Sequence, residues 1–286
     1  MIETEIIKEE QATVKYITKS RSGKIKIAAK NKSTMAVHIT LIFLVVITVY
    51  AFFTFDYKNI DFSEAMHDTL RNIGTAFFQP RLRYDSFLGA LYQLLITFCL
   101  GVLSTIFGTV IAFFGSLLCA KNIAKANTAN IVKSIVAFIR AVPTILWVLI
   151  FAVSAGLGSV AAVVGLTFHS ASYLTKAYAE SIEEMDYGTI EALKASGASY
   201  WQIVFQAIVP ASISYMVAWT FMRFEINFAN AVAVGAAAGA GGIGYSLFMA
   251  GGFYFDLRET GFLTLIIVGA VIILEIISTK LKEKVK

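Results

Sequence analysis

The stretch EALKASGASYWQIVFQAIVP, residues 191–210, is a half-polar interruption between two apolar segments. Alanine, leucine and lysine near its start favour a helix, and Thr189 can cap a helix that begins at Ile190. Gly197 suits the left-handed position at which helices often end, because glycine adopts that conformation without steric cost. The sequence therefore predicts a short helix that ends at Gly197.

A second helix is predicted directly after this elbow. Ser199 and Gln202 have the spacing of a capping box, in which each residue binds the other's backbone N–H. Pro210 disfavours the α conformation in Val209, so we expect a break where the following apolar segment starts. Each short helix has an apolar side. Periodicity leaves two interpretations open: a helical loop lying on lipid headgroups, or a docking element whose apolar side enters a groove of a soluble partner.

The composition around this stretch is that of an integral membrane protein. Of the 286 residues, 57% are hydrophobic and 15% are charged, and the mean hydropathy is +0.72. Soluble domains carry about 25% charged residues. The fourth apolar segment is the least hydrophobic, because His169 and Lys176 dilute it. We predict an all-α fold with six transmembrane helices, each meeting the bilayer's need for about 20 apolar residues: about 36–54, 88–117, 134–154, 159–179, 211–235 and 261–280.

Lysine and arginine are distributed unevenly between the loops. Seventeen fall in the N-terminal segment, the loop after the second apolar segment, the region after the fourth and the C-terminus, whereas five fall on the opposite side. Cytoplasmic loops carry such an excess, so both termini and residues 191–210 are predicted to be cytoplasmic. The net charge of +5 is explained by this bias and by the attraction of basic segments to the anionic lipid bilayer. No nucleic-acid partner is therefore expected.

The loop between the first two apolar segments has its own pattern. Phe62, Met66, Leu70 and Ile73 recur there at helical spacing. This predicts an amphipathic helix that lies in the membrane interface on the extracytoplasmic side.

The stretch at 191–210 also resembles a signature of permease subunits of ATP-binding-cassette (ABC) importers. That signature is Glu-Ala-Ala, three residues, glycine, nine residues, then Ile-x-Leu-Pro, and it lies in a cytoplasmic coupling loop. Here Glu191-Ala192-Leu193 is followed at the same spacings by Gly197 and by Ala207-Ile208-Val209-Pro210. The chain departs from the signature by apolar replacements at Leu193, Ala207 and Val209. The resemblance implies an ATPase-coupling role for Glu191, Ala192, Ala195, Gly197 and Pro210.

Three longer stretches are similar to the permease of the phosphonate importer (PhnE-type). They are RAVPTILWVLIF (140–151), HSASYLTKAYAESIEEMDYGTIEALKASGA (169–198) and MRFEINFANAVAVGAAAGAGGIGYSL (222–247). The resemblance covers about residues 85–280 and implies the type I importer permease (MetI-like) fold. It departs at Phe228-Ala229-Asn230, where relatives usually place a basic residue.

The resemblance also implies a set of partners. A second copy of the chain would complete the pathway, two cytoplasmic ATPase subunits would hydrolyse ATP, and an extracytoplasmic binding protein would deliver a phosphonate-like oxyanion. A phosphite, phosphate-ester, methionine or betaine permease is an alternative. A secondary transporter would show internal repeats with paired broken helices, and the sequence has a single glycine-rich break.

The chain is therefore expected to sit in the bacterial cytoplasmic (inner) membrane and to divide into four parts. No phosphate loop of the G-x-x-x-x-G-K-[ST] type occurs in the sequence. We expect a transporter subunit with no catalytic residue, cofactor or metal of its own. The parts are a basic cytoplasmic segment (1–35), a first transmembrane helix with the extracytoplasmic loop (36–85), the permease domain (86–280) with its coupling loop (180–210), and a cytoplasmic tail (281–286).

Charged residues inside the apolar segments are candidates for the translocation pathway. A charge in the bilayer costs at least about 2.5 kcal/mol and normally faces a partner or water. Arg140, Arg223 and Glu225 are such charges. Arg223 and Glu225 lie about 200° apart around a helix, so direct pairing between them is not expected. Ion pairing between helices, contact with an anionic solute and snorkelling to the helix end are all open for the two arginines, and snorkelling suits Arg140 best.

Other pathway candidates are backbone-shaping or amide residues. Pro143 should kink the third span, as a static bend or as a gate. Asn227 and Asn230 lie three residues apart on one helix face, where they would line a pore or bond across helices. The glycine-rich run at 235–244 would expose N–H groups to an anion or allow tight packing at a dimer axis, and its candidates are Gly239, Gly241 and Gly242.

Overall fold

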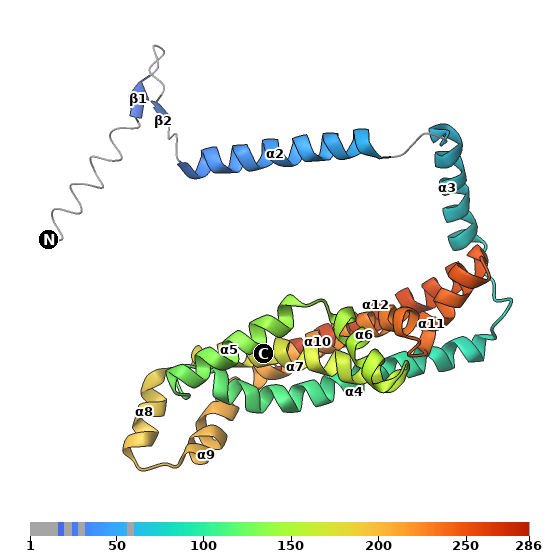
Figure 1. Ribbon diagram of the computed structural model, residues 1–286. Helices are drawn as coiled ribbons and strands as arrows, with labels where there is room; N and C mark the ends of the chain where they lie inside the picture. The colour runs from blue at the N-terminus through green and yellow to red at the C-terminus, as the bar shows by residue number, and fades with distance from the viewer. Residues whose placement is uncertain (1–16, 20–24, 28–31, 56–59, 286) are drawn as a thin grey trace. The chain divides into compact units, whose positions relative to one another are not determined.

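The computed structural model describes residues 17–19, 25–27, 32–55 and 60–285 (Figure 1). The chain forms two compact units, Met1–Ala65 and Met66–Lys286. In the first unit, β1 (Ile17–Lys19) pairs antiparallel with β2 (Ile25–Ile27). This short hairpin lies within the basic N-terminal segment, and its two strands are the only ones among the described residues.

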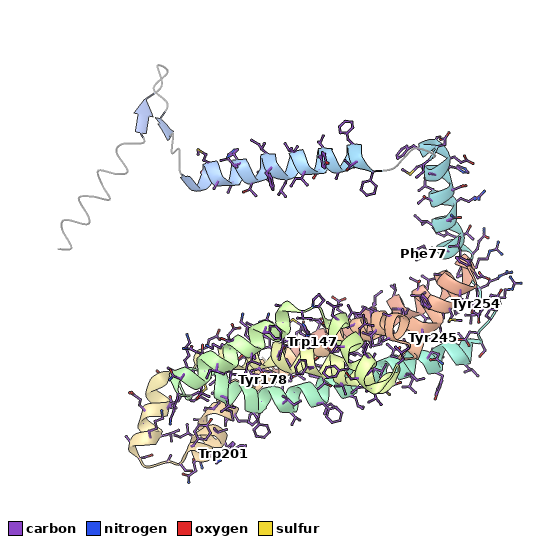
Figure 2. All side chains as sticks on the ribbon, in the orientation of Figure 1. Phe77, Trp147, Tyr178, Trp201, Tyr245 and Tyr254 are labelled. Atoms are coloured by element: carbon purple, nitrogen blue, oxygen red, sulfur yellow. The ribbon has the colours of Figure 1, made fainter. Side chains whose placement is uncertain are left out.

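The first unit also contains α2 (Lys32–Thr54), the first predicted span. Its stretch Thr34–Thr54 is apolar over its whole circumference, and none of it is buried within the protein. The apolar side chains project all round the helix axis in Figure 2. A helix that is apolar all round and covered by no protein suits a lipid environment.

The second unit is a bundle of helices, preceded by α3 (Phe62–Phe78), which begins in the first unit. α3 is the helix predicted for the extracytoplasmic loop, and its apolar residues are exposed. Helix α7 lies at the centre of the bundle and packs against α4, α5, α6 and α10. The remaining elements are α4 (Phe87–Cys119), α5 (Ala126–Ala141), α6 (Thr144–Ala155), α7 (Ser159–Glu183), α8 (Tyr187–Ala195), α9 (Tyr200–Ile203), η1 (Val204–Ile208), α10 (Val209–Ala238), α11 (Gly242–Phe248), η2 (Met249–Phe253) and α12 (Leu257–Val285).

The all-helical membrane fold is confirmed, but the count of six spans is not reproduced. By length and composition, four described helices qualify as spans: Thr34–Thr54, Phe87–Cys119, Tyr200–Ala238 and Leu257–Leu281. The bent pair α5–α6 would make a fifth. Helix α7 coincides with the predicted span 159–179, yet it falls outside this set. It is rich in buried serine, threonine and alanine, because it contacts other helices more than lipid.

The predicted span 134–154 is divided at Pro143, where the sequence predicted a kink. Helices α5 and α6 meet at 89°, which is a sharp corner rather than a kink. Val142 adopts an extended conformation (φ −90°, ψ 125°), as residues before proline do. Pro143 then precedes the first residue of α6.

Close approach between helices depends on glycine at two central places. A Cβ added to Gly165 of α7 would lie 2.6 Å from Val148 Cα of α6. A Cβ on Gly108 of α4 would lie 2.8 Å from Ser170 Cβ of α7. Small residues at such crossings allow helix backbones to come together within a membrane.

Candidate functional site

Helices α8 and α9 lie at one end of the bundle and carry most of the importer signature (Figure 1). Helix α8 begins at Tyr187 rather than at the predicted Ile190. Its cap is Asp186, whose Oδ1 accepts from the Gly188 N–H at 3.2 Å. The prediction that Thr189 caps the helix is therefore wrong. Aspartate is at least as good an N-cap as threonine, and the earlier cap gives the helix extra length.

The elbow after α8 has the predicted geometry. Gly197 has φ +83°. Its N–H donates to Lys194 O at 3.0 Å, and the Ala198 N–H donates to Leu193 O at 3.0 Å. This pair of hydrogen bonds is the Schellman motif. The predicted capping box is also present, with Gln202 Oε1 accepting from the Ser199 N–H at 2.7 Å.

The predicted break at Pro210 is absent. Helix α9, the π turn η1 and α10 form one continuous helix from Tyr200 to Ala238. Val209 is helical (φ −60°, ψ −53°), and its N–H donates to Val204 O, five residues back. A π turn accommodates proline, because it relieves the crowding between the proline ring and the preceding turn. The helix that follows Gly197 is thus the first part of a long apolar helix and not a separate short helix.

The apolar side of α8 is covered by the chain itself. Ile190 is fully buried and packs with Ile182 and Ile203 in one core cluster, and Leu193 is half-buried against it. The side chains on the opposite side of α8 are exposed, including Glu191 and Lys194. Both interpretations of the loop gave α8 a free apolar side, and the structure corrects them. Among the signature residues, those exposed are Glu191, Ala192, Ala195, Gly197 and Pro210.

Helix α9 and the following turn η1 differ, because their aromatic residues are exposed. Trp201 and Phe205 stack with ring centroids 5.9 Å apart, and Tyr200 meets Trp201 edge to face. All three are at least 43% exposed. Trp201 is labelled at this end of the bundle in Figure 2. The loop thus presents a polar side on α8 and an aromatic one on α9.

A carboxylate that the sequence did not single out, Glu183, lies at the last residue of α7. Glu183 Oε1 accepts from Lys133 Nζ at 2.8 Å and from the Lys121 N–H at 2.7 Å. Partial burial alone would raise the pKa of Glu183, but these two hydrogen bonds and the lysine charges lower it below its ordinary value. Lys121 and Lys133 are two of the seventeen basic residues on the predicted cytoplasmic side. Here they tie α5 and the preceding loop to the end of α7.

The second group of candidate residues lies where α5, α7 and α10 meet. Arg223 is 2% exposed. Its Nε donates to Ser170 Oγ at 3.0 Å, and its Nη2 lies 2.9 Å from His169 Nδ1. Its guanidinium lies 5.2 Å from the centre of the Tyr173 ring, and that of Arg140 lies 5.3 Å from the same ring. In the described part of the chain these contacts are all with neutral groups, so ion pairing between helices is not what holds Arg223.

The polar residues that follow Arg223 on α10 have different surroundings. Asn227 is fully buried; its Nδ2 donates to Thr105 Oγ1 at 2.8 Å, and its Oδ1 accepts from Ser170 Oγ at 2.9 Å. Asn227 therefore bonds across α4 and α7. Glu225 and Asn230 are half-buried.

The glycine-rich turn leads into α11, which lies at the other end of the bundle from α8 and α9 (Figure 1). Gly239, Gly241 and Gly242 all have positive φ. However, the Gly242 N–H donates to Gln93 Oε1 at 3.0 Å, and the Ile243 N–H donates to Thr97 Oγ1 at 2.9 Å. These two N–H groups are bound by α4, so they do not form the anion cradle that the sequence suggested. Gln93 and Thr97 carry no local sequence signal for this role.

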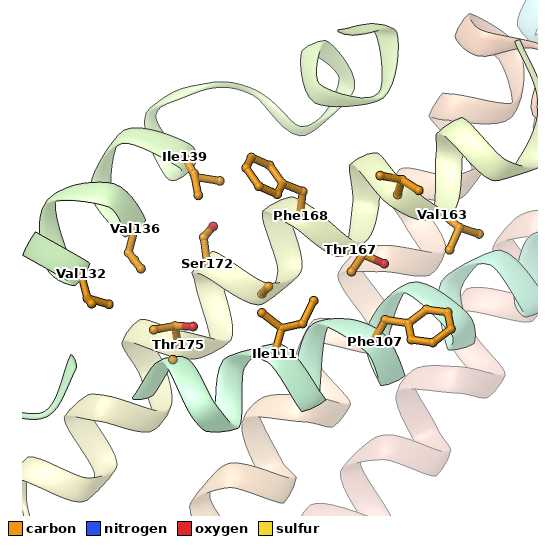
Figure 3. Close-up of a pocket in the computed structure, with 13 residues that line it drawn as sticks. Phe107, Ile111, Val132, Val136, Ile139, Val163, Thr167, Phe168, Ser172 and Thr175 are labelled. Atoms are coloured by element: carbon orange, nitrogen blue, oxygen red, sulfur yellow. The ribbon is translucent and has the colours of Figure 1, made fainter. Parts of the chain in front are cut away.

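The described cavities differ sharply in character. The largest, about 580 Å³, lies between α4, α5 and α7 and is lined almost entirely by apolar side chains, including Phe107, Ile111 and Phe168 (Figure 3). None of its lining residues is charged, so it does not suit an anion. A smaller cavity of about 220 Å³ is lined by charged residues: Lys133, Arg140, Lys176, Glu180 and Glu183.

Comparison with known proteins identifies the family of the chain. Residues 112–283 match the model of a family described as "binding-protein-dependent transport system inner membrane component". A phosphate-import permease protein, PhnE, from Mycolicibacterium smegmatis is 30% identical over 53% of this chain, an alignment that spans only 29% of that relative. A phosphite transport system permease protein, PtxC, from Stutzerimonas stutzeri is 30% identical over 64% of this chain and 67% of its own length.

The fold is shared with solved transporters. The membrane chain of an inward-facing MetNI methionine ABC transporter superposes with a TM-score of 0.61 at 22% identity, covering 69% of this chain and 96% of that one. The predicted MetI-like fold is confirmed, as is the prediction of a permease subunit rather than a catalytic one. The chain belongs to the family of binding-protein-dependent transport system inner membrane components.

Proposed function

We propose that the chain is the permease subunit of an ABC importer for a phosphorus oxyanion such as a phosphonate or phosphite. In this proposal two copies form the translocation pathway, two cytoplasmic ATPase subunits supply the energy, and an extracytoplasmic protein delivers the solute. The observation that carries it is the coupling loop. Its Schellman elbow at Gly197 joins the exposed polar side of α8 to a helix that continues into the apolar bundle.

The loop geometry supports a mechanical role. The exposed side of α8, with Glu191 and Lys194, is the surface that an ATPase subunit would contact. The opposite side is anchored through Ile190 to the core that contains Ile182 of α7. A displacement of α8 would therefore reach α7 directly and α10 through Gly197, without an intervening flexible linker.

The substrate class rests on two further supports. The relatives described above are named for phosphate and phosphite transport. In addition, Arg140 and Arg223 place two positive charges inside the bundle beside neutral groups. A net anion complements this arrangement better than a zwitterion such as methionine or betaine, which brings its own cation.

The topology and location complete the proposal. The excess of lysine and arginine favours a cytoplasmic N-terminal segment (1–35), coupling loop (180–210) and tail (281–286) in the inner membrane of a bacterium. Residues 36–85 would then contribute the first span and an extracytoplasmic interfacial helix, and residues 86–280 the permease domain.

The test is uptake by the complete transporter in proteoliposomes. We expect ATP-dependent accumulation of radiolabelled phosphite or methylphosphonate that requires the binding protein. Glu191→Arg and Gly197→Leu should each leave basal ATP hydrolysis intact while uptake falls at least about tenfold, because a charge reversal or a strained elbow disturbs the contact with the ATPase. Lys125→Gln, an exposed residue outside the loop, is the control.

Two results would contradict the proposal. Unchanged coupling in both variants would remove the loop from energy transfer. Uptake driven by an ion gradient without ATP would instead identify a secondary transporter.

A further inference from the structure

We propose that Arg140, Tyr173 and Arg223, together with His169, form a binding position for a tetrahedral phosphorus oxyanion inside the membrane-spanning bundle. The inference rests on the proposed function for the class of solute. It adds the place where the permease itself would hold that solute.

The position is assembled from three helices. Tyr173 of α7 has two guanidinium groups over its ring, that of Arg140 from α5 at 5.3 Å and that of Arg223 from α10 at 5.2 Å. The two guanidinium carbons are thus no farther apart than these distances together. Guanidinium groups are planar, always charged, and bind phosphate-type oxygens in a bidentate manner. In the proposed position each guanidinium would bind a different oxygen of the same tetrahedral anion.

The charges around the arginines favour an anion. The nearby carboxylates are engaged by lysines: Glu183 pairs with Lys133 at 2.8 Å, and Glu180 pairs with Lys176 at 3.4 Å. The described contacts of Arg140 and Arg223 are with neutral side chains. An intramembrane cation held only by neutral groups is costly unless it faces water or a charged ligand.

His169 adds a hydrogen-bond donor to the same place. A guanidinium can only donate, so the contact of Arg223 Nη2 with His169 Nδ1 at 2.9 Å requires Nδ1 to accept. The proton of the neutral ring is then on Nε2, where it is available to donate. This arrangement keeps the histidine uncharged beside two cations and gives it a role that does not depend on proton transfer.

The position is connected to a charged cavity rather than to the apolar one. Arg140 lines the 220 Å³ cavity together with Lys133 and Lys176 at the ends of α5 and α7 nearer the coupling loop. Neither arginine lines the 580 Å³ cavity of Figure 3. The 220 Å³ cavity is also lined by Glu180 and Glu183, which pair with Lys176 and Lys133, so Arg140 is its one cation without a described carboxylate partner.

The test measures binding to the purified full-length chain in a maltoside detergent free of phospholipid. Methylphosphonate is the probe, and its ³¹P line width reports binding. We expect saturable broadening, with affinity reduced at least about tenfold by Arg140→Gln and by Arg223→Gln, as for loss of a charged hydrogen bond. Arg223→Lys should retain part of the affinity. Arg71→Gln, which removes an exposed arginine of α3, is the matched control and should leave binding unchanged.

The remaining outcomes distinguish a free oxyanion from a lipid headgroup. They also distinguish failure of the binding position from failure of the proposed function. If Arg223→Gln does not fold, the half-buried Arg140 decides the question alone. Equal affinity in wild type and Arg140→Gln would overturn the binding position while leaving oxyanion uptake by the complete transporter intact. Binding of short-chain phosphatidylglycerol without binding of methylphosphonate would assign the arginines to a lipid headgroup and also overturn it. Loss of uptake for every phosphorus oxyanion, with binding retained, would instead contradict the proposed function.

Discussion

Gly197 at the coupling end and Gly242 at the opposite end of the bundle both adopt left-handed backbone, with φ +83° and +77°. Their surroundings differ. No heavy atom lies within 4 Å of a Cβ added to Gly197, whereas a Cβ on Gly242 would overlap Thr97 Oγ1. Gly197 is needed for its conformation alone, and its exposed loop is free to contact a partner. The turn around Gly242 is locked against α4.

The carboxylates at the two ends show the same contrast. Glu183, at the coupling end, is partly exposed and binds one lysine side chain and one backbone N–H. Glu259, at the first turn of α12, is 2% exposed. It accepts from three successive backbone N–H groups, those of Arg83, Tyr84 and Asp85, at 3.0 to 3.3 Å. The end with the glycine-rich turn is therefore held by more buried backbone contacts than the end that carries α8.

The largest expected effect is at the end with the glycine-rich turn. A Cβ on Gly244 of α11 would overlap Val232 O, a backbone atom of α10 that has no freedom to move aside. Gly244→Ala should lower the free energy of unfolding by about 3 kcal/mol, as overpacking does. Thermal unfolding of the detergent-purified chain, followed by its tryptophan fluorescence, measures the loss.

Gly269→Ala is the matched control, because nothing lies within 4 Å of its added Cβ on α12. Alanine is the better helix former by about 1 kcal/mol, so this variant should be as stable as wild type or more stable. Equal unfolding temperatures for the two variants would refute the close packing of α11 on α10.

The next largest loss of stability is expected on substitution of the buried carboxylate of Glu259. Glu259→Gln removes the negative charge that accepts from three N–H groups, and we expect a loss of about 2 kcal/mol, in the range of a hydrogen bond to a charged group. Glu275→Gln on the same helix changes the same group at an exposed position and should be neutral. If both variants unfold at the same temperature, the clamp on residues 83–85 contributes nothing to stability.

These contrasts separate what sequence reveals from what it does not. Gly197 and the capping box of Ser199 and Gln202 were predicted correctly, because both depend on residues a few positions apart. Thr189 failed as a cap since Asp186 competes for the same helix start. Pro210 failed as a break because its effect depends on whether a π turn forms before it, and the sequence carries no separate signal for that turn.

The candidate site was predictable only in part. Arg140 and Arg223 stand out as charges within apolar segments. Tyr173, Ser170 and His169 do not stand out, because their importance comes from contacts with Arg223 on another helix. Ser170 and His169 lie more than fifty positions from Arg223 in the sequence. Glu183 and Glu259 were missed for the same reason: nothing local distinguishes a carboxylate that binds distant backbone N–H groups from a solvated one.

Substitution of Gly197 should lower the stability of the chain less than the previous variants do, but it should lower ATP-dependent uptake strongly. Gly197→Ala forces a side chain into left-handed backbone, which costs about 1 kcal/mol, and no neighbour adds a clash. Asparagine tolerates this conformation better than alanine, so Gly197→Asn should fall between wild type and Gly197→Ala. The unfolding temperatures should follow this order. ATP-dependent uptake should follow it more steeply, and an unchanged uptake in Gly197→Ala would show that the elbow is not a coupling element.

The smallest effect is the pH dependence contributed by Glu183. Its pKa is lower in the folded chain than its ordinary value of 4.5, so the unfolded state binds its proton more readily. The hydrogen bonds to Lys133 and Lys121 are then fully stabilising above the ordinary pKa and are lost as the pH falls through the folded-state pKa. Wild type should lose its advantage over Glu183→Gln only at acidic pH, which unfolding scans from pH 7 down to pH 3, about the range that carboxyl titration covers, would measure.

Glu180→Gln is the control for the pH dependence that Glu183 contributes. Glu180 lies three residues earlier on α7 and pairs with Lys176 at 3.4 Å, but both side chains are more than half exposed. Exposed pairs of this kind contribute little, so Glu180→Gln should unfold like wild type across the scan. A difference from wild type that shrinks with acidity in Glu183→Gln and is absent in Glu180→Gln would locate the pH-sensitive contact at the base of the coupling helix. The same profile in both variants would mean that the tie between α5 and α7 is no stronger than an ordinary surface pair.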